Sequence, residues 1–155
     1  MRGKPATKRV IAPDEKYSRE DIAKFINYIM ERGKKSVAKN IVYEALEIIS
    51  DKTKVDPLVV FDTAIKNAAP TVEIKGRRVG GANYQVPMAV RPSRSYTLGC
   101  RWIIGAAKAK KGRRMAIKLA EELTAAYNNE GAAIKKKQDT YRMAEANRAF
   151  AHFSR

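Results

Sequence analysis

The chain has 155 residues, with 32 Lys and Arg against 16 Asp and Glu, so its formal net charge is +16. Its length fits one domain with at most a short appendage, and a hydrophobic content of 45% is enough for a core, which excludes full disorder. A single Cys and a single His exclude an internal disulfide and a Cys/His zinc cluster.

So large a basic excess indicates a polyanionic partner, either nucleic acid or an anionic membrane. The excess is concentrated in residues 74–120, which hold twelve bases and no acid. The flanking segments 20–73 and 121–155 have net charges of −1 and +1, and residues 1–19 carry +4. Because a surface that is only solvated mixes both signs, this window indicates a surface that binds phosphates.

Residues 1–17 are predicted to form a basic N-terminal arm, since they contain Pro5 and Pro13 and show no apolar period. The first helix is expected to begin at Ser18, whose side chain can cap it, and to end at Gly33. No apolar signal region follows the basic N-terminus, and no apolar stretch approaches the ~20 residues that cross a bilayer. We therefore expect a cytosol-like location and no membrane partner.

Two further helices follow before the pattern changes. One opens at Lys34-Lys35, and the next opens at Asp56-Pro57, a capping residue before a first-turn proline, and ends at Pro70. The apolar stripes of these three helices predict the first part of the core, which consists of Ile22, Phe25, Ile26, Ile29, Met30, Val37, Ile41, Val42, Ala45, Leu46, Ile49, Leu58, Phe61, Ile65 and Ala68.

A β-hairpin is predicted over about residues 71–90, where apolar residues alternate with polar ones on either side of Gly80-Gly81. Because a lone two-stranded hairpin is only marginally stable in water, it should rest on the helices or on a partner. Tyr84 near its tip fits two roles, either stacking on an unpaired base or fixing the hairpin to the helices.

Three more helices complete the chain: one that Ser93, after Pro92, can cap and that runs to about Ala109, one with Met115 in its first turn, and a last one from about Ala132 into the 150s. The predicted fold class is therefore mainly α. It is a single six-helix domain over residues 18–155, with a β-hairpin arm that protrudes between the third and fourth helices.

Catalysis has little support in the sequence. His152 is isolated between two phenylalanines, Glu121 and Glu122 are expected on an exposed helix face, and Cys100 is expected to pack as a small hydrophobe. The hairpin glycines lack the spacing of a dinucleotide fingerprint, and no phosphate-loop or nucleophile-elbow motif occurs. We therefore expect no enzyme, no cofactor and no metal site.

Nucleic-acid binding has a coherent physical basis instead. Arg94, Arg101 and Lys108 are spaced seven residues apart on the expected fourth helix, so they share one face and form a basic ridge. At the hairpin tip, Arg77 and Arg78 stand beside glycines that permit close approach of a ligand. Contacts of this kind fix position on a nucleic acid more than they select its sequence.

Two long motifs resemble the small-subunit ribosomal protein S-seven family in its bacterial or organellar form. They are residues 77–87, Arg-Arg-Val-Gly-Gly-Ala-Asn-Tyr-Gln-Val-Pro, and residues 142–152, Arg-Met-Ala-Glu-Ala-Asn-Arg-Ala-Phe-Ala-His. Residues 33–35, 101–102 and 131–137 are also similar to the family pattern. At Leu98-Gly99-Cys100 the chain departs from the larger aliphatic residues of the family.

The resemblance implies a non-enzymatic structural constituent of the small ribosomal subunit that binds the 3′ major domain of 16S-type rRNA and organises assembly of the 30S head. It further implies that the hairpin and the C-terminal helix lie near exit-site tRNA and mRNA. The neighbouring head and platform proteins would be S-nine, S-eleven, S-thirteen and S-nineteen. The location would be the cytoplasm, with an organellar ribosome as the alternative.

Carried over position by position, the resemblance implies RNA contacts in every part of the chain. The expected rRNA contacts are Lys8, Arg9, Lys34, Lys35, Lys75, Arg77, Arg78, Arg91, Arg94, Arg101, Lys108, Lys110, Lys111, Arg113, Arg114, Met115, Lys135, Lys136, Arg142 and Arg148. The residues expected near the tRNA and mRNA are Gly80, Gly81, Asn83 and Tyr84.

Three other classes of protein compete with this interpretation. An architectural DNA-binding protein would also combine helices with a basic β-arm, but such arms insert an apolar wedge that Arg-Arg-Val-Gly-Gly does not offer. An RNA-modifying enzyme would need a cofactor motif or an acid–base pair that the sequence lacks. A membrane-surface protein is the remaining alternative.

Overall fold

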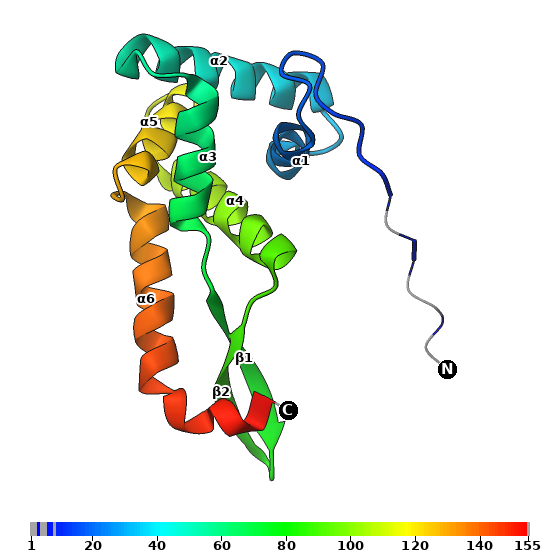
Figure 1. Cartoon of the computed structure of the whole chain (residues 1–155), viewed down its shortest axis with the longest axis vertical. Coiled ribbons are helices and arrows are strands. Elements are labelled where there is room, and N and C mark those ends of the chain that lie inside the picture. The colour runs from blue at the N-terminus through cyan, green and yellow to red at the C-terminus, as the bar shows by residue number, and fades with distance from the viewer. Residues whose placement is uncertain (1–2, 4–5, 8, 155) are drawn as a thin grey trace.

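The computed structural model describes residues 3, 6–7 and 9–154, and it shows a helical body from which a β-hairpin projects (Figure 1). The helices are α1 (Glu20–Ile29), α2 (Lys35–Thr53), α3 (Pro57–Ala68), α4 (Pro92–Ala109), α5 (Met115–Tyr127) and α6 (Ala132–Ala146), followed by a 3-10 helix, η1 (Arg148–Ser154). The strands β1 (Val72–Val79) and β2 (Ala82–Ala89) lie between α3 and α4. The mainly α fold with an arm between the third and fourth helices is therefore confirmed, and the described residues contain η1 as an additional helix.

The helix starts follow local chemistry, but two of the expected caps are wrong. Asp56 caps α3 as expected, since its carboxylate accepts a hydrogen bond from the amide of Leu58 at 2.9 Å. Ser18 does not cap α1, because it lies in a turn with a φ of 52° and the N-cap position belongs to the next residue. Ser93 lies inside α4, whose first residue is Pro92, a residue that has no amide hydrogen to satisfy.

The N-terminal arm is anchored before the first helix begins. Asp14 is buried, and its carboxylate accepts hydrogen bonds from the hydroxyl of Tyr43 on α2 at 2.7 Å and from the amide of Lys16 at 3.1 Å. Burial and the contact with Asp14 raise the pKa of Tyr43 to about 12, so this hydroxyl remains a donor at physiological pH. The part of the expected arm that follows Asp14 is therefore tied to the helical body.

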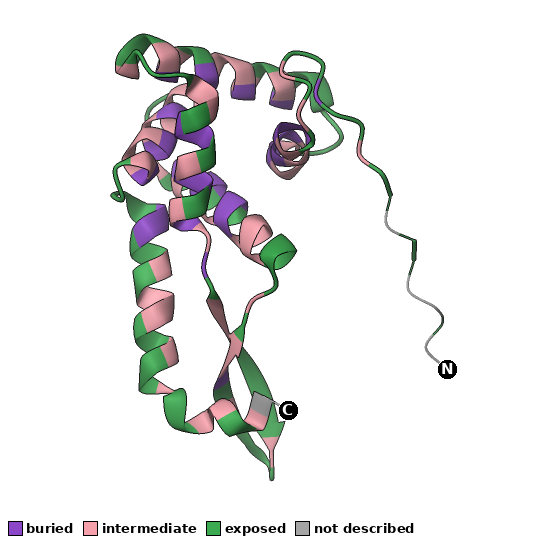
Figure 2. Ribbon diagram, viewed as in Figure 1, coloured by how far each residue is buried: buried purple, intermediate pink, exposed green. Residues whose placement is uncertain are grey.

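The core lies around α4, which packs against α1, α3, α5 and α6. Buried residues occupy the facing sides of the helices, whereas most of the hairpin and most of α6 are exposed or half-buried (Figure 2). Phe25 of α1 and Phe61 of α3 meet edge to face, with ring centroids 5.1 Å apart. Val37 was expected in this core but is 51% exposed, because it sits in the first turn of α2, beyond the helices that cover the rest of its stripe.

The backbones of α3 and α4 lie close together at Gly99. An ideal Cβ there would lie 3.2 Å from the carbonyl oxygen of Ile65 and 3.3 Å from the backbone of Ala69, both on the α3 side. Any Cβ here would press on the backbone of α3, so in this chain the departure from the larger residues of the family pattern lets the two backbones lie this close.

Replacement of Gly99 by Ala should lower the free energy of unfolding by about 1–3 kcal/mol, because the backbone of α3 cannot yield as a flexible side chain would. The matched control is Gly105→Ala in the same helix, where a Cβ meets nothing within 4 Å. That change should raise the free energy of unfolding by about 0.5–1 kcal/mol, the usual gain for Ala over Gly in a helix. Equal effects of the two changes in denaturant unfolding would contradict the close packing.

The hairpin is a regular antiparallel pair that ends in a two-residue turn. Val79 pairs with Ala82, and Gly80 and Gly81 between them have φ values of 56° and 90°. Positive φ at both central residues gives the turn a twist that matches the strands, and glycine adopts it without strain.

The last helix is shorter than the sequence predicted. α6 ends at Ala146, and Asn147 adopts a φ of −101° while its side-chain amide donates to the carbonyl of Met143 at 2.8 Å. The chain then turns into η1, which crosses the hairpin (Figure 1). The physical reason is aromatic packing, because the Tyr84 ring on β2 lies 5.0 Å from the ring of Phe150 and 5.3 Å from that of Phe153.

We call Tyr84, Phe150 and Phe153 the aromatic clamp. Replacing both phenylalanines by Ala should free the hairpin, because a two-stranded sheet without a packed face is marginal. Amide hydrogen exchange of β1 and β2 in the isolated protein should then accelerate by at least about tenfold. Met143→Ala on the exposed side of α6 should leave it unchanged, and unchanged exchange in the double variant would show that the clamp does not hold the arm.

Candidate nucleic-acid interface

The face of α4 that points away from the core carries the basic ridge. The buried face of α4 consists of Gly99, Cys100, Ile103, Ile104 and Ala107. Burial raises the pKa of the Cys100 thiol to about 12, so this thiol stays protonated and serves as a packing residue. The three ridge residues are exposed: Arg94, Arg101 and Lys108. Their backbone positions are thus set by the core behind them.

Acidic residues from other elements fold against the ridge. Glu73 at the base of β1 contacts Arg94 at 3.3 Å and Lys75 at 3.2 Å, and Glu31 in the turn after α1 pairs with Lys108. Partial burial raises the pKa of Glu73, but the hydrogen bonds from Lys75 and Arg94 outweigh it, so the pKa lies below its ordinary value. Residues 74–120 contain no Asp or Glu, but acidic side chains from outside this window contact its basic residues in the folded chain.

The pair of Lys108 with Glu31 does not block the ridge from a phosphate. In the pair of Lys108 with Glu31, the side chains are 44% and 69% exposed. Exposed pairs of this kind contribute only about 0–1 kcal/mol, so a nucleic-acid phosphate can replace the carboxylate at little cost. The guanidinium of Arg101 lies 5.9 Å from the ring centroid of Tyr28 on α1, which steadies it without neutralising its charge.

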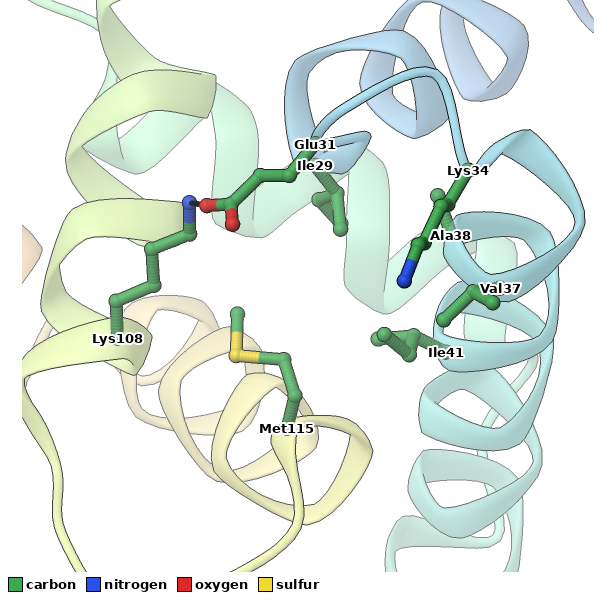
Figure 3. A pocket seen from close by; sticks show the side chains of 8 residues that line it. All are labelled: Ile29, Glu31, Lys34, Val37, Ala38, Ile41, Lys108 and Met115. Atoms are coloured by element: carbon green, nitrogen blue, oxygen red, sulfur yellow. Dashed lines mark hydrogen bonds and ion pairs between the residues drawn. The ribbon is translucent and has the colours of Figure 1, made fainter.

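The ridge ends at a pocket of about 390 Å³ between the turn after α1, α2, α4 and α5 (Figure 3). Its apolar lining comes from Ile29, Val37, Ala38, Ile41 and Met115. Figure 3 shows the ammonium groups of Lys34 and Lys108 at opposite sides of this lining, with Glu31 against Lys108.

Three of the expected contacts thus meet here from three separate elements: Lys34, Lys108 and Met115. Among the described residues, Lys34 has no acidic side chain within 4 Å, so its charge is available. An apolar lining between two cations can take a flat aromatic group together with its anionic attachment. The partly exposed Val37, which sequence patterns assign to the core, belongs to this lining.

The linker between α4 and α5 adds a second basic group, and it too is paired. Arg114 contacts Glu44 of α2 at 3.1 Å, and Arg113 pairs with Glu121 of α5. Lys110 contacts Glu122 at 3.1 Å. Lys111 is exposed, and no acidic side chain of the described residues lies within 4 Å of it.

Glu122 is predicted from the sequence to lie on an exposed helix face, and this prediction is wrong. It is 1% exposed, and its Oε1 accepts a hydrogen bond from the amide of Ala133 at 3.0 Å. The spacing contained a signal for this placement, since Leu119 and Ala126, three residues before and four after, are core residues of the same helix face.

The remaining expected contacts lie away from the pocket. On the hairpin, Arg77 donates to the carbonyl of Phe153, and Tyr84 belongs to the aromatic clamp, which favours the second of the two roles considered for it. In the N-terminal arm, Arg9 lines a hollow together with Lys24 and Arg94, whereas Lys8 lies outside the described residues. The exposed bases at other places are Lys35, Lys75, Arg78, Arg91, Lys135, Lys136, Arg142 and Arg148, and the exposed tip residues are Gly80, Gly81 and Asn83.

Among the described residues, no helix is both long and apolar enough to cross a membrane. The same residues contain no cluster of three His, Cys, Asp or Glu side chains that could hold a metal ion. The features that remain for chemistry are a rigid basic face, an apolar pocket at its end and a clamped arm, which fit a binding protein.

Comparison with known proteins agrees with this geometry. The family model described as "Ribosomal protein S7p/S5e" matches residues 1–148. The small ribosomal subunit protein uS7 of Thermotoga maritima is 58% identical over 153 residues, which cover 99% of both chains. The uS7 proteins of Acinetobacter baumannii and Desulfatibacillum aliphaticivorans are 54% and 51% identical and cover 94% and 98% of this chain. The chain therefore belongs to the S7p/S5e family of ribosomal proteins, in its bacterial uS7 form.

Proposed function

We propose that the chain binds the 3′ major domain of 16S-type rRNA with the ridge of α4 and the pocket at its end, and thereby organises assembly of the head of the small subunit. As a member of its family it is a structural constituent of the small ribosomal subunit and not an enzyme. The proposal concerns which surface binds, which part of the RNA it binds, and what that binding does.

The observation that carries the proposal is the continuity of ridge and pocket. Arg94, Arg101 and Lys108 form one exposed face, and Lys108 also borders the pocket that Lys34 and Met115 share. Backbone phosphates would run along the ridge, and an unstacked base would enter the apolar pocket. Since a packed helix holds these groups in place, binding orders few side chains and little affinity is lost to entropy.

The hairpin is proposed to act on a different partner. Its turn, Gly80 and Gly81, is exposed and lies beyond the helical body (Figure 2), whereas the aromatic clamp holds the hairpin at Tyr84, in the third residue pair from the turn. An arm that is held just behind its turn and free at the turn itself can reach exit-site tRNA and mRNA. The proposed protein neighbours are S-nine, S-eleven, S-thirteen and S-nineteen, and the proposed location is the cytoplasmic ribosome.

The ridge should dominate rRNA affinity. Replacing Arg94 and Arg101 together by Gln should weaken binding to a transcript of the 3′ major domain by roughly 100-fold, about 1.4 kcal/mol for each lost phosphate contact. The slope of log affinity against log salt should become shallower by about 0.7–0.9 for each contact. Filter binding over 50 to 200 mM salt, with unfolding measured in parallel, provides the test.

The matched control for the ridge variant shortens the hairpin at its turn, where residues 79–82 carry no charge. Replacing residues 79–82 by Asn-Gly retains the turn chemistry and shortens the hairpin. This variant should bind the transcript within about twofold of the original chain and enter subunits, but it should disturb retention of exit-site tRNA. A shortened arm that abolishes rRNA binding, beside a ridge variant that does not, would reverse the proposed division of roles.

A further inference from the structure

We infer that Lys110, although it is basic and lies between the ridge and α5, contacts no phosphate; together with the buried Glu122 it forms an internal ion pair that positions the α4–α5 linker for rRNA. The inference rests on the proposed function, because it assigns a role within that binding surface. It separates Lys110 from the neighbouring Lys111, which stays available to the RNA.

Glu122 is a buried carboxylate. It and Asp14 are the buried polar or charged side chains of the described residues, and Glu122 is 1% exposed. A buried carboxylate is costly unless each oxygen has a partner. Oε1 accepts from the amide of Ala133 at 3.0 Å, and Oε2 lies 3.1 Å from the ammonium of Lys110. Both oxygens are therefore occupied, and Lys110 is the cation that balances the charge.

Helix α6 begins next to the Glu122 carboxylate. Its N-cap residue, Gly131, provides no side-chain hydrogen bond, so the carboxylate of Glu122 serves as the acceptor for the first turn and supplies the negative charge that a helix N-terminus favours. Gly131 has a φ of 94°, and an ideal Cβ on it would lie 2.9 Å from Oε1 of Glu122. One carboxylate thus joins α5, the first turn of α6 and the end of α4.

The ion pairs along the linker differ in exposure. Arg113 and Arg114 have side chains that are 62% and 76% exposed, so they can exchange their carboxylates for phosphate. Lys110 is 34% exposed, and its removal would leave Glu122 buried with an unbalanced charge, which is strongly destabilising. Lys110 therefore keeps its carboxylate when RNA binds, and it fixes the place where the linker leaves α4.

The test is a double-mutant cycle on the full chain, read by salt-dependent binding to a transcript of the 3′ major domain. The variants are Lys110→Met, Glu122→Gln and the pair together, with Lys111→Met as the matched control and denaturant unfolding as a second measurement. Glu122→Gln keeps an oxygen for the amide of Ala133 but removes the charge that Lys110 balances. Comparing Lys110→Met in the two backgrounds separates positioning from phosphate contact.

If Lys110 is a positioning residue, Lys110→Met should weaken RNA binding about fivefold without changing the salt slope, and the loss should shrink below about twofold in the Glu122→Gln background. Lys111→Met should make the slope shallower by about 0.7–0.9. The inference is overturned if Lys110→Met makes the slope shallower or loses the same factor in both backgrounds, if it has no effect in either, or if Lys111→Met leaves the slope unchanged. A chain that binds the transcript without salt dependence, before any substitution, would instead refute the proposed function.

Discussion

The contact between the backbones of α3 and α4 at Gly99 determines how the rest of the molecule can be arranged. Because an ideal Cβ at this position would lie 3.2 Å from the carbonyl of Ile65, the two helices cross with no side chain between them. α4 is consequently enclosed on one side by α1, α3, α5 and α6. On its opposite side the three ridge bases are exposed and seven residues apart. The direction of the basic face therefore depends on the packing of the face behind it.

Charge is arranged on this scaffold in two ways. Exposed pairs such as Lys108 with Glu31 hold basic side chains in place while leaving them able to exchange partners with a phosphate. The buried pair of Lys110 with Glu122 cannot exchange in this way, because separation would leave a carboxylate without solvent or a cation. A count of basic residues along the sequence does not distinguish Lys108 from Lys110, although the carboxylate partner of Lys108 is exposed and that of Lys110 is buried.

The hairpin illustrates a second constraint, the marginal stability of an isolated pair of strands. The end of the chain stabilises the hairpin, since Phe150 and Phe153 of η1 pack on Tyr84. The same contact explains why the last helix cannot continue straight, as its apolar edge must turn to reach β2. The arm is thus held on β2 at Tyr84, and the glycine turn beyond that point is exposed, so the turn can contact a partner while the strands keep their direction.

Much of this arrangement follows from local sequence patterns. The cap at Asp56, the glycine turn at Gly80-Gly81 and the seven-residue spacing of the ridge each have a short-range physical cause, and each appears in the structure. What could not be predicted depends on contacts between distant residues. The aromatic clamp joins Tyr84 to residues some seventy positions later, and Val37 lines the pocket where α4 ends and α5 begins. Glu122 is an intermediate case, because its spacing placed it on the core face but its charge suggested solvent.

The most direct test of the account is the rRNA affinity of a Gly105→Leu variant. Gly105 lies one turn from both Arg101 and Lys108 on the ridge, is exposed, and has open space around it. Leucine adds bulk there without altering charge, and its better helix propensity should raise the free energy of unfolding by about 0.5–1 kcal/mol. If RNA packs against this face, affinity for the 3′ major domain should fall by at least about tenfold in a protein that is no less stable. Unchanged affinity would contradict the assignment of this face as the rRNA surface.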